Sequence, residues 1–153
     1  MTKRSRLGSR GYRGYRTLVK LVREGTAYEP VVVTNPRDIY DFLAHVRNAD
    51  RESLYSVLMD AQNQVVGCEE VSRGSLNVTR TRPAEVYKSA LLANALSLIL
   101  AHNHPSGTLD PSQEDIEFTR GMAQAGELLG IHLHDHVIVT DRGYTSLRER
   151  GLL

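Results

Sequence analysis

The sequence predicts an α/β domain in which a mixed β-sheet is flanked by helices. Segments with the apolar spacing of helices alternate with short β-like runs, in the order (β)αββαβαββ between residues 29 and 149. The run LSLILA at residues 96–101 is apolar apart from one serine, as in a strand that is covered on both faces. A mixed sheet with helices packed against it satisfies both observations.

The first helix is expected over residues 35–48, NPRDIYDFLAHVRN. Asn35 is a suitable N-cap, and Pro36 fits the first helical position, where an amide hydrogen is not needed. Apolar residues then recur at the i, i+3, i+4, i+7 spacing of one helix face, namely Ile39, Phe42, Leu43 and Val46. The preceding run EPVVVT, residues 29–34, is a candidate additional strand.

The remaining elements are predicted from turn residues and apolar periodicity. The other strands are expected at residues 54–61, 65–76, 131–140 and 144–149, and the other helices at residues 82–95 and 112–130. The polar run QNQ joins the first two of these strands as a hairpin or meander. Pro83 opens one helix, Gly130 is the expected C-cap of the other, and the turn DRG closes a terminal hairpin.

Charge divides the 153-residue chain into two parts. Residues 1–23 carry eight basic residues and no acidic one, whereas the rest carries eleven of the 19 basic residues and all 18 acidic residues. We therefore expect a basic N-terminal arm at residues 1–29 and a folded domain at residues 30–153. The arm contains the run RGYRGYR, which suits contact with the phosphates and bases of a nucleic acid. The alternative is a solvated tail or a charge-protected strand edge.

A single cysteine, Cys68, excludes an intrachain disulfide and favours a reducing, cytoplasmic compartment. We expect its thiol to be buried. The longest mostly apolar run, residues 89–101, is too short to span a bilayer. No apolar segment of the kind found in secretory signals follows the basic N-terminus.

Two histidines follow the expected strand 96–101 in the stretch HNHPSGTLDPSQED. Side chains two apart on a strand share one face, so His102 and His104 point the same way and Asn103 points the other way. Pro105 cannot extend a central strand, so the chain leaves the sheet there.

An aspartate in the same stretch completes a candidate metal site. Ser112 is the natural N-cap of the next helix and Asp115 lies in its first turn, next to the edge of the sheet. If Asp115 converges with His102 and His104, two nitrogens and one oxygen leave a fourth tetrahedral position for water, as in catalytic zinc sites. The competing interpretation is a simple capping box, S-x-x-D, beside a chance H-x-H pair.

The whole stretch fits the H-x-H-P-x6-S-x-x-D pattern of the JAMM/MPN+ metalloproteases. Its flanks, EEVSRGSLN, PAEVYKSAL, LILAHNHPSG, PSQEDIEFTR and LLGIHLHDHVIV, resemble the RadC family, which is known by its association with DNA repair. The resemblance runs from about residue 30 to the C-terminus. It implies an MPN/JAB architecture, which is similar to that of cytidine deaminases.

The resemblance also implies roles for individual residues. One Zn²⁺ per chain would be held by His102, His104 and Asp115. Glu52 corresponds to the glutamate that serves these enzymes as general base, and Ser112 to the serine that stabilises the oxyanion. A water molecule on zinc would then attack an amide or isopeptide carbonyl of a protein or peptide substrate.

Several assignments stay open at this point. Glu69 and Glu70 are rivals of Glu52 for the base, and strand alternation allows only one of those two to face the metal. Ser112 can act as N-cap, as oxyanion donor or as both.

The strand IHLHDHVIV offers a second histidine cluster. His132, His134 and His136 alternate onto one face if the strand is regular, which would allow a second metal site, although partial exposure is the simpler reading for the first two. Asp135 is a candidate partner for a ligand imidazole, with purely structural hydrogen bonding as the alternative.

The favoured function is that of a zinc-dependent metallopeptidase-type hydrolase. The main alternative is a DNA repair or recombination accessory protein that binds nucleic acid through its arm and keeps the metal for structure. A metal-dependent nuclease is less favoured, because phosphoryl transfer commonly uses two ions and the motif offers one credible carboxylate ligand.

Overall fold

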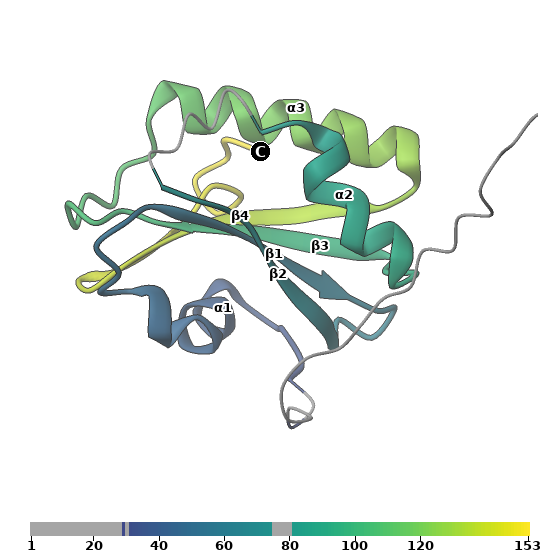
Figure 1. Cartoon of the computed structure of the whole chain (residues 1–153), viewed down its shortest axis with the longest axis horizontal. Helices are drawn as coiled ribbons and strands as arrows, with labels where there is room; N and C mark the ends of the chain where they lie inside the picture. The colour runs from purple at the N-terminus through teal and green to yellow at the C-terminus, as the bar shows by residue number, and fades with distance from the viewer. Residues whose placement is uncertain (1–28, 30, 75–80) are drawn as a thin grey trace, which may run out of the picture.

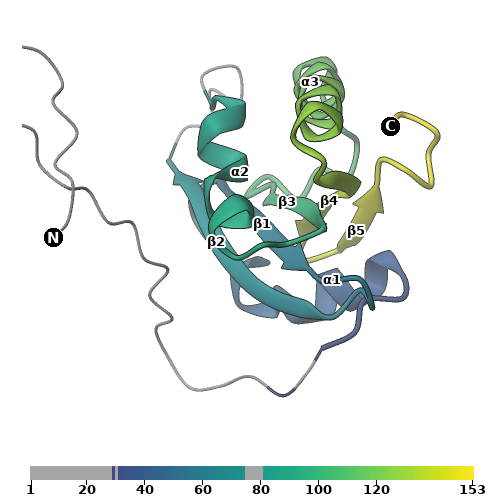
Figure 2. The ribbon, with the colours of Figure 1, turned by 90° about the vertical axis from the view of Figure 1, so that its right-hand side faces the viewer.

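A computed structural model describes residues 29, 31–74 and 81–153 of the chain. Five strands form one mixed sheet in the order β2-β1-β3-β4-β5, with α1 on one face and α2 and α3 on the other (Figures 1 and 2). The strands are β1 (Ser53–Met59), β2 (Val65–Arg73), β3 (Ser97–Asn103), β4 (His132–Thr140) and β5 (Gly143–Ser146). The helices are α1 (Pro36–Phe42), η1 (a 3₁₀ turn, Ala44–Val46), α2 (Pro83–Leu92) and α3 (Gln113–Leu129). The predicted α/β class is confirmed.

The sheet topology brings distant parts of the chain to one edge. β1 is antiparallel to both β2 and β3, whereas β3 is parallel to β4 and is connected to it through α3. The amino end of β1 therefore lies beside the carboxyl ends of β3 and β4. The last backbone pair of the β1–β3 ladder is Leu54 with His102, so residues just before β1 and just after β3 meet at this edge.

Two apolar layers hold the helices to the sheet. The layer under α2 and α3 includes Leu54, Leu100 and Tyr87, all buried. α3 approaches α2 closely at Gly126, where an added Cβ would lie 2.5 Å from the Tyr87 hydroxyl and closer still to the Ile131 carbonyl oxygen. Only glycine fits there, and the hydroxyl of Tyr87 donates to the Met122 carbonyl at 2.8 Å.

The first helix is shorter than its periodicity suggests. Asn35 caps it as predicted and forms a reciprocal capping box with Asp38, but α1 ends at Phe42 and the chain continues as the 3₁₀ turn η1. The guanidinium of Arg47 explains the break, because it donates to the Tyr40 carbonyl at 2.5 and 3.1 Å and lies 3.4 Å from the centroid of the Tyr40 ring. Those bonds satisfy a carbonyl at the helix end.

Two predictions at the β2 side of the sheet are wrong. The run at residues 29–34 contributes only an isolated bridge between Val32 and Gln64, not a strand. Cys68 is exposed rather than buried, because β2 is the edge strand and α1 lies beneath β4 and β5 instead (Figure 2).

The other local signals are confirmed. Ser112 caps α3, and Gly130 follows the helix in the left-handed conformation with φ 70°. None of the helices in the described ranges is long and apolar enough to cross a membrane. Residues 1–28 of the basic arm lie outside the described residues.

Candidate metal centre

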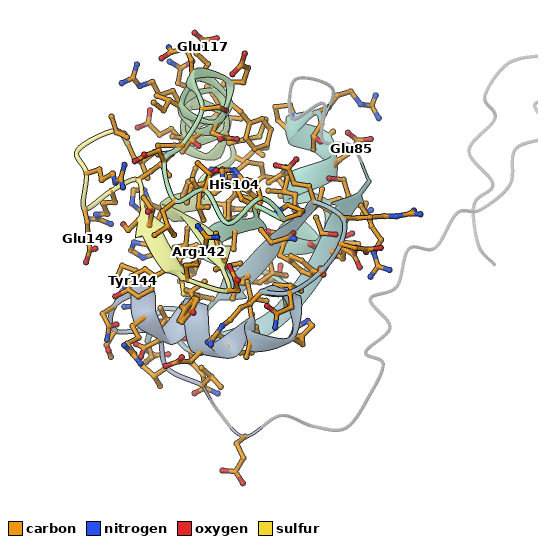
Figure 3. The ribbon with its side chains drawn as sticks, turned by 90° about the vertical axis from the view of Figure 1, so that its left-hand side faces the viewer. Glu85, His104, Glu117, Arg142, Tyr144 and Glu149 are labelled. Atoms are coloured by element: carbon orange, nitrogen blue, oxygen red, sulfur yellow. The ribbon has the colours of Figure 1, made fainter. Side chains whose placement is uncertain are left out.

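The predicted metal ligands meet at the edge where β1 begins and β3 ends. His102 is the next-to-last residue of β3, and His104 follows the strand directly. Figure 3 faces this edge and shows His104 between α3, whose outer side carries Glu117, and the turn between β4 and β5, which carries Arg142. The loop after His104 returns the chain to α3, which brings Asp115 back over the imidazoles.

Four side chains surround one point at this edge. The Nε2 atoms of His102 and His104 are 2.8 Å apart. Asp115 oxygens lie 3.5 Å from the first of these atoms and 3.7 Å from the second, and Glu52 Oε1 lies 4.0 Å from each. Ligands bound at about 2 Å to one zinc ion are themselves roughly 3–4 Å apart, so these separations fit a common cation.

Within the described residues, one group of three or more metal-binding side chains occurs. It consists of Glu52, His102 and His104, each of which offers a ligand atom within 4.8 Å of the others. Asp115 lies beside both histidines, but its Oδ2 also accepts from the amide and the hydroxyl of Ser112. The structure thus brings together all five residues that the sequence singled out, although their roles stay predictions.

A backbone carbonyl fixes the tautomer of His104. Its Nδ1 lies 2.7 Å from the Thr108 carbonyl oxygen. Because a carbonyl only accepts, Nδ1 of His104 carries the proton and donates it. In the neutral ring, Nε2 then presents its lone pair to the site.

A chain of three hydrogen bonds fixes the tautomer of His102. The Thr119 hydroxyl donates its single proton to the Asp115 carbonyl at 2.6 Å, so it accepts from Nδ1 of His136, also at 2.6 Å. Nε2 of His136 then accepts from Nδ1 of His102 at 2.7 Å. His102 therefore also directs the lone pair of its Nε2 into the site, opposite that of His104.

The ionisation of the buried groups agrees with these tautomers. Burial lowers the pKa of His102 well below its ordinary value, and burial also lowers the pKa of His136 to about 4, so both rings are neutral at pH 7. Asp115 accepts a hydrogen bond from the protonated form of His104, and this raises the pKa of His104 despite its partial burial. The site thus stabilises positive charge between the two imidazoles and the carboxylate, whether a proton or a metal ion carries it.

The two carboxylates differ in their environments. Burial alone would raise the pKa of Asp115, but hydrogen bonds from His104 and Ser112 and the electrostatic attraction of His102 hold that pKa below the ordinary value. Burial raises the pKa of Glu52, whose side chain is 28% exposed. Asp115 is thus a permanent anion, whereas Glu52 is able to take up and release a proton nearer neutrality.

Ser112 has two bonding partners within its own capping box. Its Oγ accepts from the Asp115 amide at 3.1 Å and donates to Asp115 Oδ2 at 2.7 Å. The residue as a whole is exposed, although the bonds of its hydroxyl are partly buried. To donate to an oxyanion, Ser112 must turn its single proton away from Asp115.

Both rivals of Glu52 form ion pairs away from the histidines. Glu69 forms an ion pair with Lys88 on α2, with an N···O distance of 3.1 Å. Glu70 lies on the opposite face of β2 and binds the guanidinium of Arg73 at 2.6 Å. Neither carboxylate belongs to the group around the histidines.

The histidines of β4 do not share one face. A bulge makes His134 an extra residue between the pairs that β4 forms with β3, so His136 turns to the α3 side while His132 and His134 remain together on the other side. Their ring centroids are 4.8 Å apart, at a site away from the metal ligands.

Asp135 has a structural role in this arrangement. It accepts from the hydroxyl of Ser146 at 2.5 Å and from the amides of Arg148 and His136 at 3.0 and 2.7 Å. Of the two interpretations left open, structural bonding is the one its contacts match. The partner of the ligand imidazole His102 is His136 instead.

Three residues of the site were not identified from the sequence. The sequence places His136 in a histidine cluster and the family resemblance pairs it with Asp135, but neither predicts its bond to His102. Thr119 has no predicted role, and Asn103 is expected only on the opposite side of the strand. Thr119 carries a signal that was available, because it lies four residues after Asp115 and so shares its helix face. The roles of His136 and Asn103 depend on tertiary contacts.

A mixed sheet with helices on both faces, which gathers two histidines and a carboxylate beside a helix start, is consistent with the JAB class of domains and with a possible metal site. The RadC-like JAB domain model matches residues 33–152, and the chain therefore belongs to the family of RadC-like JAB domains.

Three relatives illustrate the extent of the similarity. The chain is 48% identical over 123 residues to the UPF0758 protein of Moorella thermoacetica and 47% identical over 124 residues to that of Symbiobacterium thermophilum. It is 40% identical over 139 residues to the UPF0758 protein of Desulfitobacterium hafniense. These matches cover 80%, 80% and 88% of this chain but 54%, 53% and 61% of the relatives, so the chain spans about half the length of the first two.

Proposed function

We propose that the domain is a zinc-dependent hydrolase that cleaves an amide or isopeptide bond in a protein or peptide. One observation carries the proposal. His102 and His104 aim two ring nitrogens at each other 2.8 Å apart, and the proton on the far nitrogen of each ring is committed to another acceptor. Two facing lone pairs repel unless a cation lies beside them, and Asp115 supplies the balancing negative charge.

The donor set favours zinc among divalent cations. Two imidazole nitrogens and one carboxylate oxygen, with one position left for solvent, form the usual ligand set of a hydrolytic zinc site. When bound, zinc would polarise a carbonyl and lower the pKa of a water molecule to about 7. His102, His104 and Asp115 would hold the ion.

Glu52 is placed to move protons in this reaction. Its carboxylate is equidistant from both ligand nitrogens at 4.0 Å, partly buried, and free of the ion pairs that occupy Glu69 and Glu70. The raised pKa of Glu52 brings it closer to that of the groups with which it would exchange a proton. Glu52 would accept a proton from the attacking water and deliver it to the leaving amine.

Ser112 would stabilise the negative charge that develops on the carbonyl oxygen. Removal of one such donor costs about 3 kcal/mol of transition-state stabilisation, or more than 100-fold in rate. Loss of the N-cap costs only about 1 kcal/mol of folding stability. Ser112→Ala should therefore lose turnover with a mild loss of stability, and a lowered melting temperature with intact turnover would refute the catalytic role.

The decisive experiment combines metal analysis with a cleavage screen. Elemental analysis of the purified chain should find one zinc per chain, lost in His104→Ala and retained in Glu52→Gln. A library of peptides and isopeptides should show cleavage that a chelator stops and that Glu52→Gln reduces to a small residual rate. Glu69→Gln is the matched control, since it removes an equivalent carboxylate outside the site and should turn over normally. Cleavage that survives both chelation and Glu52→Gln would contradict the proposal.

A second function, nucleic-acid binding by the arm, is supported by the eight basic residues that residues 1–23 hold without a single acidic one. It is compatible with hydrolysis, because the arm and the metal centre are separate in the sequence. In that case the arm would bring the domain to substrates that lie on DNA.

A further inference from the structure

Asn103 stands between the two histidine ligands in the chain, but its side chain bonds to another strand. Its Oδ1 accepts from the Ser53 amide at 2.8 Å and its Nδ2 donates to the Arg51 carbonyl at 2.9 Å. These two backbone groups lie immediately on either side of Glu52. We infer that Asn103 is the positioning residue that holds Glu52 beside the metal centre. This inference rests on the proposed function.

The side chain of Asn103 continues the β1–β3 ladder where the backbone pairing stops. The ladder ends at Leu54 and His102, and the next peptide groups of β1 bond to a carboxamide instead of to a main chain. Asn103 is fully buried, so water does not compete for these bonds. On the β2 side, the Gly74 amide donates to the Glu52 carbonyl at 3.0 Å.

The backbone around Glu52 is therefore fixed from both neighbouring strands. Only the side-chain torsions of Glu52 remain free to adjust its carboxylate. This matters because a displacement of about 1 Å in a catalytic group is sufficient to slow a reaction about 100-fold. Since Asn103 directly follows His102 and precedes His104, a single strand end sets the positions of two ligands and of the base.

The contact needs the chemistry of a carboxamide. One half must accept from an N–H group and the other must donate to a carbonyl, which asparagine does in one plane. Asn103→Asp keeps the bond to Ser53 but sets a carboxylate oxygen against the Arg51 carbonyl. Asn103→Leu has a similar volume and makes neither bond.

The first test measures amide hydrogen exchange by NMR in the full chain, with and without zinc. In Asn103→Leu we expect the Ser53 amide to exchange roughly 10-fold faster or more, as for the loss of one buried hydrogen bond. The Val57 amide, in the middle of β1, should be unchanged. Asn35→Ala is the matched control, because it removes an asparagine side chain that bonds to backbone at the cap of α1, away from the site.

The second test separates positioning from simple structural support. With the peptide that the wild type cleaves fastest, Asn103→Leu should lower kcat about 100-fold while the zinc content and KM stay within twofold. In a Glu52→Gln background, Asn103→Leu should cause no further loss, because it acts through the glutamate. Asn103→Asp should give a smaller loss of kcat, and it serves in the same assays if Asn103→Leu does not fold.

Each outcome bears on the inference. Unchanged Ser53 exchange would overturn it, as would faster exchange with an unchanged kcat or an additive loss in the Glu52→Gln background. If the wild type cleaves no peptide, the hydrolase proposal fails and takes the role in catalysis with it. The Ser53 exchange would then still report whether Asn103 holds this segment, so the two failures are distinguishable.

Discussion

Replacing Thr119 by valine should weaken zinc binding without touching a ligand. The Thr119 hydroxyl accepts the Nδ1 proton of His136, which in turn accepts the Nδ1 proton of His102. Thr119→Val keeps the shape of the side chain but removes that acceptor. His136 then gains by moving its proton to Nε2, which forces His102 to carry its own proton on Nε2, where the metal would bind.

The magnitude follows from the contacts that are lost. The buried Nδ1–H of His136 loses the hydroxyl that accepts its proton, which costs about 1–3 kcal/mol if the ring does not change tautomer. If His136 changes tautomer, it avoids that cost, but His102 must then lose the proton on its Nε2 before the metal can bind there. We expect zinc affinity to fall about 10- to 100-fold, or ~1.4–2.7 kcal/mol, as is usual for the loss of a partner behind a ligating imidazole.

The assay is a competition for zinc between the protein and a chelating dye at pH 7, paired with ¹⁵N NMR of the imidazole nitrogens. Thr119→Ser is the control, because it retains the hydroxyl and should bind zinc within about twofold of the wild type. Wild-type zinc affinity in Thr119→Val, with Nδ1 of His102 still protonated, would refute the reasoning.

Three further outcomes concern parts of the chain away from the metal centre. Gly126→Ala should cost about 1–3 kcal/mol of unfolding free energy in urea, because its Cβ meets backbone, whereas Gly121→Ala in the same helix has open space and should be neutral or stabilising. Burial raises the pKa of Tyr87 from 10.0 to about 12, so the protonated phenol contributes folding stability that is fully present below pH 10 and is lost as the pH rises towards 12. Tyr87→Phe removes the titrating hydroxyl and its bond to the Met122 carbonyl. In urea unfolding measured across pH, this variant should lose less stability at alkaline pH than the wild type does. Deleting residues 1–16 should abolish salt-dependent binding of fluorescent DNA, and unchanged binding would refute a role for the arm.

Local signals in the sequence were sufficient for most helices and strands. Asn35 with Pro36, Ser112, and Gly130 mark element ends through bonds within one turn, and all three are observed where predicted. The end of α1 was not predictable in the same way. It depends on the guanidinium of Arg47 reaching back seven residues to Tyr40, which the apolar spacing does not encode.

The residues of the site fall into the same two groups: some could be predicted from local sequence, and others depend on tertiary contacts. His102, His104 and Asp115 lie within fourteen consecutive residues, so their convergence was readable from one strand end and one helix start. The choice of Glu52 over Glu69 required the family resemblance, because register alone decides which carboxylate meets the imidazoles. The exposure of Cys68 follows from the strand order, which the sequence does not state.

The bulge in β4 lets two residues that are three positions apart face the same helix. Leu133 and His136 both lie on the α3 side of the sheet, which regular alternation would not allow with two residues between them. Because His134 is the residue without a partner in β3, its deletion would leave the pairs on both sides of the bulge in register. A chain that lacks His134 should therefore keep the proton acceptor of His102 in place, and the change should be felt on the opposite face, where His132 and His134 meet.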